Sequence, residues 1–202
     1  MNFMARSIVA LTALVFVAVS SVHAADASPT LSRIQKSGKL VVGTSGSMPL
    51  MSEKLMTGEL VGFDIDMAKA LAETMGVKVE FKTMPFDQLI PSLEQGKVDV
   101  VMSNMTMTIE RNMRVAFAGP YFVSGKCLVT KEQEMAKADD PEDLKESDAK
   151  IAVVGGTTSE AFVKELMPKI QRVAVDSVDK GTNMVAKGEV CLLYTSPSPR
   201  DS

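Results

Sequence analysis

The chain has 202 residues and a formal net charge of −3, with no clustered Lys/Arg patch. Nucleic-acid binding usually needs such a patch, so the composition excludes nucleic acid as a partner. The sequence holds one histidine, His23, and two cysteines, Cys127 and Cys191. So few cysteines indicate a protein that is held together by its apolar core and not by disulfides.

Residues 1–24 have the pattern of a secretory signal. Arg6 supplies the positive charge, residues 8–19 are almost all apolar, and Val22 and Ala24 stand at −3 and −1 of a cleavage site. The run is shorter than the roughly 20 apolar residues of a membrane span. We expect a cleaved signal and a periplasmic protein, with an uncleaved N-terminal anchor as the alternative. Cleavage would remove His23, which excludes a histidine triad, a zinc site and a histidine base; no metal or cofactor is predicted.

Residues 31–128 form the first predicted lobe, in which strands and helices alternate. Strands are expected over 40–42, 77–81 and 98–102, and helices over 64–75, where Asp64 can cap, and 86–95. This β-α-β-α-β order indicates a parallel sheet covered by helices. Ligands of such sheets sit beyond the carboxyl ends of the strands. The turn at 43–47, which holds Ser45, and the turn at 103–108 should therefore line one crevice.

Residues 129–190 repeat this order and form the second predicted lobe. A capped helix start at 140–144 precedes a strand at 151–154, a glycine-rich turn, and a helix at 159–166. A further strand at 172–175 leads to Ser177, which can cap a helix ending near Gly188. The fold class is therefore α/β, with two lobes that face each other.

Residues 191–202 do not fit this pattern. A strand is expected after Gly188, and residues 190–194 have the apolar character for one. The residues after it have no apolar periodicity, which favours disorder. The segment also looks like translated adapter sequence of the kind found at the ends of metagenomic reading frames. We therefore expect 191–202 to be a foreign or a disordered tail, and the second lobe to be incomplete.

Arg111 is the strongest candidate for a ligand-binding residue. It follows a strand-end turn that carries Thr106 and Thr108, and its guanidinium fork can hold a carboxylate by two hydrogen bonds. A surface arginine is the alternative. The turn at 156–159, which includes Thr157, precedes a helix and offers backbone N–H groups, but it lacks the lysine of a phosphate-binding loop. Periodicity places Phe86 in the core. Asp64 and Asp66 are read as helix-start residues and not as a metal pair.

The sequence resembles the extracellular solute-binding proteins of polar amino-acid ABC transporters, which have the type II periplasmic-binding-protein fold. The resemblance covers about residues 31–190 and rests on the stretches 62–68, 86–93, 96–99, 105–111, 120–125 and 156–158. It implies a monomeric receptor, not an enzyme, that captures a free amino acid between its lobes and delivers it to a membrane permease.

The resemblance also implies roles for individual residues. Arg111 and Thr106 would hold the ligand α-carboxylate, and Thr158 would add a backbone N–H. The Asn104 carbonyl would accept a hydrogen bond from the ligand ammonium, Ser103 would line the same edge, and Phe86 would stack against the ligand. The expected ligand-binding set is Arg111, Thr106, Asn104, Ser103, Phe86, Thr158, Thr157 and Ser45.

Three departures from the family pattern affect the ligand. Residues 47–50 contain no aromatic side chain, Val154 stands where relatives often place Gln or Lys, and the acidic partner of the ligand ammonium would lie beyond Val190. Two other classes stay open on the same fold. One is a cyclohexadienyl dehydratase-like enzyme, for which Glu53 or Glu59 would have to serve as the acid. The other is a sensor domain of a larger protein.

Overall fold

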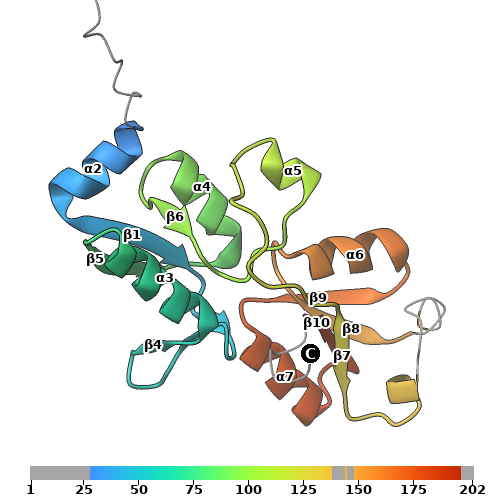
Figure 1. Cartoon of the computed structure of the whole chain (residues 1–202). Coiled ribbons are helices and arrows are strands. Elements are labelled where there is room, and N and C mark those ends of the chain that lie inside the picture. Colours follow the sequence, from blue (N-terminus) through green and yellow to red (C-terminus); the bar gives the residue numbers. More distant parts are fainter. Residues whose placement is uncertain (1–27, 138–143, 145–147, 197–202) are drawn as a thin grey trace, which may run out of the picture. The chain divides into compact units, whose positions relative to one another are not determined.

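The computed structural model describes residues 28–137, 144 and 148–196. The predicted secretory signal, most of the predicted helix start at 140–144 and residues 197–202 lie outside this description. The chain divides into two compact units, one ending at Ser37 and the other beginning at Gly38. The described part of the first unit is helix α2 (Pro29–Ser37), blue in Figure 1.

The predicted parallel sheet of the first lobe is confirmed. Its strands are β1 (Lys39–Thr44), β5 (Lys78–Thr83) and β6 (Val100–Val101), with β1 in the centre and parallel to both neighbours. Helix α3 (Phe63–Thr74) connects the small sheet described below to β5. The 3-10 helix η1 (Phe86–Gln88) runs into α4 (Leu89–Glu94) before β6 (Figure 1). The carboxyl ends of β1 and β6 therefore lie side by side.

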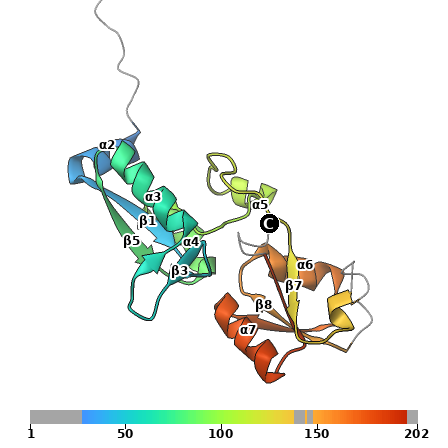
Figure 2. The same ribbon diagram turned by 60° about the horizontal axis from the view of Figure 1, so that its bottom comes forward.

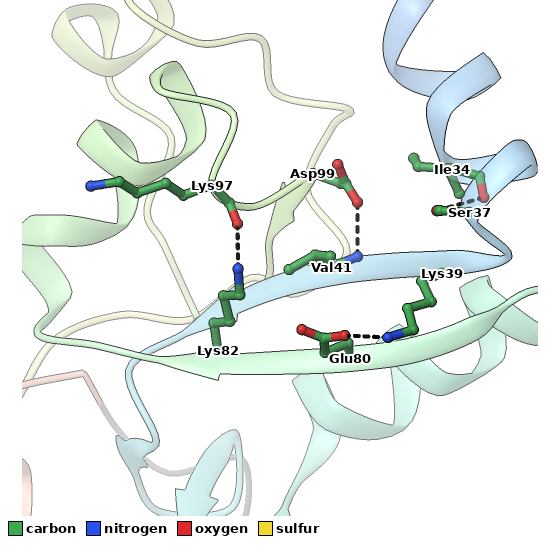
Figure 3. A network of polar contacts seen from close by, with 8 residues as sticks. All are labelled: Ile34, Ser37, Lys39, Val41, Glu80, Lys82, Lys97 and Asp99. Atoms are coloured by element: carbon green, nitrogen blue, oxygen red, sulfur yellow. Dashed lines mark hydrogen bonds and ion pairs between the residues drawn. The ribbon is translucent and has the colours of Figure 1, made fainter.

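A side chain extends the pairing between β1 and the start of β6. The backbone N–H of Asp99 donates to the Val41 carbonyl at 2.8 Å. The Asp99 Oδ2 atom accepts from the Val41 N–H, also at 2.8 Å, as Figure 3 shows. Lys39 and Glu80 form an ion pair of 3.1 Å between β1 and β5. On the β5 side, Lys82 Nζ donates to the Lys97 carbonyl at 3.1 Å. The contacts of Asp99 and of the Lys97 carbonyl hold the segment that precedes the turn at 103–108.

A small antiparallel sheet and a short helix complete the first lobe. The sheet consists of β2 (Ser47–Met48), β3 (Ser52–Lys54) and β4 (Leu60–Val61). The sequence did not predict it, because strands of two or three residues are too short to show a period of two. Helix α5 (Ile109–Asn112) places Arg111 directly after the polar turn, as expected.

The second lobe is built on a four-stranded sheet in the order β7-β10-β8-β9. The strands are β7 (Cys127–Thr130), β8 (Lys150–Val154), β9 (Gln171–Val175) and β10 (Leu192–Thr195), and β7 is antiparallel to β10. Figure 2 shows β7 and β8 of this sheet. Helices α6 (Thr158–Leu166) and α7 (Val178–Lys187) contact this sheet, and a short 3-10 helix η2 (Met135–Lys137) follows β7. Strand β7 crosses the predicted lobe boundary at 128/129.

Alternation along the strands produces two cores in this lobe. Ile151 and Val153 of β8 pack with Val163 of α6, whereas Ala152 and Val154 pack with Val185 of α7. Successive residues of a strand point to opposite faces, so α6 and α7 cover opposite sides of the sheet. The helix predicted from Ser177 to Gly188 is confirmed, because Ser177 is the N-cap of α7 and left-handed Gly188 its C-cap.

The segment 191–202 is ordered where the structure describes it. Leu192 to Thr195 form a central strand, pairing with β7 on one side and β8 on the other, and their side chains are buried. The strand expected over 190–194 is confirmed as β10, and among residues 192–195 the expected disorder is wrong for Thr195 alone. The apolar side chains of β10 fill both cores, which explains why these residues form a strand: Leu192 and Tyr194 belong to the α6 side and Leu193 to the α7 side.

Candidate functional site

A cavity of about 510 Å³, part of it continuous with solvent, is lined by residues of both lobes. All eight residues of the predicted ligand-binding set contribute to its lining, although no ligand is present to assign their roles. The other lining residues are Ser47, Met48, Lys126, Val154, Ser159, Val178, Tyr194, Thr195 and Ser196.

A chain of hydroxyl groups joins the turns that follow β1 and β6. The Ser45 backbone N–H donates to Ser103 Oγ at 2.9 Å, and Ser103 Oγ in turn donates to Ser45 Oγ at 3.1 Å. Ser47 Oγ donates to Ser45 Oγ at 3.0 Å. The prediction that the two turns line one crevice is confirmed, and its cause is the parallel pairing of β1 with β6.

Arg111 reaches the cavity from the start of α5. The Thr108 hydroxyl caps this helix by accepting from the Arg111 backbone N–H at 3.2 Å. The guanidinium donates from Nη1 to the Thr106 carbonyl at 2.7 Å and from Nη2 to the Gly156 carbonyl at 3.1 Å. Burial lowers the pKa of Arg111, and the charge of Glu110 opposes that shift. A guanidinium has five N–H donors, so others stay available for a ligand.

Phe86 lines the cavity, so the core position that periodicity predicted is wrong. Its side chain is half-buried, and the Arg111 guanidinium carbon stands 5.5 Å from the ring centroid. A cation above an aromatic face at this distance is attracted by the ring quadrupole. Phe86 begins η1 and not the α-helix itself, and this change of helix type moves it away from the apolar face of Leu89 and Ile90.

The glycine-rich turn leads into α6 through a reciprocal cap. Thr157 Oγ1 accepts from the Glu160 N–H at 3.3 Å, while the Glu160 carboxylate accepts from the Gly156 N–H at 2.8 Å. The Gly156 N–H is thus already bonded and does not face a ligand freely. The N–H groups of Thr158 and Ser159, in the first turn of α6, are of the kind that a helix leaves without an intrahelical partner. Thr158 Oγ1 lies 3.5 Å from Thr106 Oγ1.

Asn104 has a backbone conformation that few residues adopt, with φ of 47°. Asparagine tolerates this left-handed region better than most side chains. Behind it, the buried Asp64 carboxylate accepts from the Tyr121 hydroxyl at 2.6 Å. Burial raises the pKa of Asp64 to about 6, and hydrogen bonds from Tyr121 and the Asn104 backbone oppose that rise. Asp64 is not the predicted cap, because Gly62 is the N-cap of α3.

Lys126 is the charged lining residue that the sequence did not indicate. It stands just before β7, and its Nζ donates to Thr158 Oγ1 at 2.9 Å, Ser159 Oγ at 3.0 Å and Ser196 Oγ at 3.2 Å. The stretch 120–125 directly precedes it, but that resemblance assigned no role to Lys126. The lysine reaches the cavity only because β7 begins the second-lobe sheet beside the start of α6.

The described residues contain no group of three or more His, Cys, Asp or Glu side chains that could hold a metal ion. Within the same part of the chain, no helix has the length and apolar character to cross a membrane.

Comparison with known proteins identifies the class that this fold and site define. Residues 40–190 match the family of bacterial extracellular solute-binding proteins, family 3, and the chain belongs to that family. The ABC transporter arginine-binding protein 1 of Escherichia coli (strain K12) is 34% identical over 139 residues, or 69% of this chain and 55% of the relative. The glutamine-binding protein of Geobacillus stearothermophilus is 31% identical over 170 residues, or 82% of this chain and 64% of that relative. The chain thus spans between half and two thirds of each relative.

Solved structures agree with the two-lobed type II periplasmic-binding-protein fold. The ancestral amino acid-binding protein AncCDT-1, described as a precursor of cyclohexadienyl dehydratase, superposes with a TM-score of 0.79 at 41% identity. The match covers 83% of this chain and 74% of that protein. The holo ArgBP from T. maritima has a TM-score of 0.76 at 34% identity, and the match covers 82% of this chain and 72% of that protein.

Proposed function

We propose that this protein is a periplasmic receptor that captures a free amino acid by its α-carboxylate and delivers it to an ABC permease. The observation that carries the proposal is the state of Arg111. Its guanidinium is partly buried in the cavity and bonds only to backbone carbonyls there, while none of the described lining residues bears a carboxylate. Burial favours a charged partner for a cation, and because the described lining offers no carboxylate, we infer that the ligand brings one.

The groups around Arg111 fit one carboxylate. Thr106 and Thr158 bring their hydroxyls within 3.5 Å of each other beside the guanidinium, and the first turn of α6 presents N–H groups at the positive end of its dipole. Phe86 covers one side of the guanidinium. Asn104 also lines the cavity, and in this proposal its carbonyl accepts a hydrogen bond from the ligand ammonium. The names of the curated relatives support an amino acid as ligand and a permease as partner.

Binding without chemical conversion fits the lining better than catalysis. The likeness to a dehydratase precursor raises an enzyme as the second candidate. An elimination of water needs a positioned proton donor, and the described lining residues supply hydroxyls, two cations and an amide but no carboxylate, histidine or cysteine. The binding proposal expects a bound amino acid to be recovered unchanged after incubation, as NMR of the released ligand would show.

Calorimetric titration with the free L-amino acids tests the proposal. At least one should bind, and its α-carboxamide should not, because the amide has no charge for Arg111. Arg111→Ala should remove binding. Arg114→Ala is the matched control, because Arg114 lies three residues further on, is paired with Glu94 at 2.6 Å and does not line the cavity. Circular dichroism checks that each variant is folded. Equal binding of acid and amide would overturn the proposal.

A further inference from the structure

Lys126 places a second positive charge in the same cavity as Arg111. Among the described residues, its ammonium donates hydrogen bonds to three hydroxyl groups, on Thr158, Ser159 and Ser196. A hydroxyl accepts a hydrogen bond from an ammonium but carries no charge to neutralise it. Neutral groups therefore orient the ammonium, as they would at a site where a bound ligand supplies the negative charge.

The charged side chains that the described residues bring to the cavity are both positive. The described lining residues include two cations, Arg111 and Lys126, and no carboxylate. The two cations also influence each other, because burial and the positive charge of Arg111 both lower the pKa of Lys126. One ligand carboxylate balances one of these charges. A second ligand carboxylate balances the other. With the ligand's α-ammonium included, an acidic amino acid leaves the two lysine and arginine charges and the ligand together at +1, a neutral amino acid leaves them at +2, and an amino acid with a cationic side chain at +3.

We propose that Lys126 forms a second anion-binding subsite, and that the preferred ligand is an acidic amino acid with two carboxylates. The inference rests on the proposed function, since the α-carboxylate occupies the Arg111 side. The side-chain carboxylate then accepts from Lys126 Nζ, and the hydroxyls of Thr158 and Ser159 hold the ammonium toward it. This preference separates the chain from the relatives and neighbours whose names specify arginine.

Isosteric ligand pairs test the subsite. Glutamate and glutamine, and likewise aspartate and asparagine, have nearly the same shape and differ in one charge. Of glutamate and aspartate, the one that binds more tightly should bind at least tenfold tighter than the side-chain amide of the same length, as calorimetry would show. Arginine should bind more weakly than that acid and that amide. Lys126→Gln should reduce the ratio between acid and amide at least tenfold, while Lys126→Arg, which keeps the charge, should preserve most of it.

Lys137→Gln is the matched control. Lys137 is exposed, paired with Glu134 at 2.6 Å and absent from the cavity lining, so the ratio should not change. Three results overturn the subsite. The first is tighter binding of glutamine, asparagine or arginine than of both acids. The second is an equal weakening of acid and amide by Lys126→Gln, which would assign Lys126 to the α-carboxylate. The third is an unchanged ratio in Lys126→Gln. Failure of every amino acid to bind overturns the proposed function as well, so the two failures are distinguishable.

Discussion

The Arg111 side chain donates from Nη2 to the Gly156 carbonyl oxygen at 3.1 Å, which joins the polar turn after β6 to the glycine-rich turn after β8. The same turn approaches η1, because a Cβ added to Gly156 would stand 2.9 Å from the Cβ of Asp87. Asp87 is the neighbour of Phe86 in the chain. The glycine-rich turn thus meets both the guanidinium and the segment that carries the aromatic wall.

Gly156→Ala should weaken ligand binding. The new methyl group would collide with Asp87, and Gly156 has a φ of 73°, a left-handed conformation that costs an L-residue about 1–2 kcal/mol. We expect the Kd to rise by at least about tenfold, or roughly 1.4 kcal/mol. Gly155→Ala is the control, since the nearest atom to its new Cβ is the Val175 carbonyl oxygen at 3.8 Å. Calorimetry compares the two. Equal affinities would show that the approach to Asp87 has no part in binding.

Thr157→Ala should lower stability by about 1 kcal/mol, the usual effect of removing an N-cap hydroxyl. It should also weaken binding, because the cap sets the direction of the first turn of α6, where Thr158 lines the cavity. Thr157→Ser keeps the hydroxyl and should restore both properties. Thr130→Ala removes a comparable side-chain bond, to the Cys191 carbonyl at 2.8 Å, at a residue outside the lining. Urea unfolding and calorimetry should find a loss of stability alone for Thr130→Ala.

Asp64 should make stability depend on pH. Its pKa is raised from 3.8 to about 6 in the folded protein, so its stabilising contribution is fully present below 3.8 and is lost as the pH rises through 6. A shift of this size corresponds to about 3 kcal/mol. Asp64→Asn cannot ionise, so the variant should gain stability relative to the parent protein across that window. Urea unfolding at a series of pH values measures the difference. If the difference in unfolding free energy between Asp64→Asn and the parent protein does not change with pH, the raised pKa of Asp64 is contradicted.

Asp99→Ala should destabilise the first lobe by about 1–3 kcal/mol, because the half-buried Val41 N–H loses its acceptor at 2.8 Å. Asp99→Asn retains a carbonyl oxygen at the same place and should lose less. Hydrogen exchange of the Val41 amide, followed by NMR, should accelerate in the alanine variant more than in the asparagine variant. An unchanged exchange rate in both would mean that the Asp99 carboxylate does not protect this amide.

The sequence by itself determined the local elements and the part of the site that lies beside them. The alternation of apolar residues, the capping residues Ser177 and Gly188, and a polar turn followed by Arg111 are short-range signals. Each depends on residues within one helix or strand, where the backbone geometry sets the spacing. The carboxyl-end rule for parallel sheets then brought the Ser45 and Ser103 turns together without any structure.

The tertiary structure decided the remaining features of the site. Lys126 lies in the cavity because β7 starts next to α6; Phe86 leaves the core because a 3-10 turn precedes α4; and Tyr121 meets Asp64 across 57 residues of chain. None of these contacts has a period or a motif, since they join segments that the sequence leaves far apart. Long-range packing also buries Leu192 to Thr195 between β7 and β8, although the sequence that follows them has no pattern of order. Local periodicity reports which face of an element is apolar, and only the packed chain sets which element covers that face.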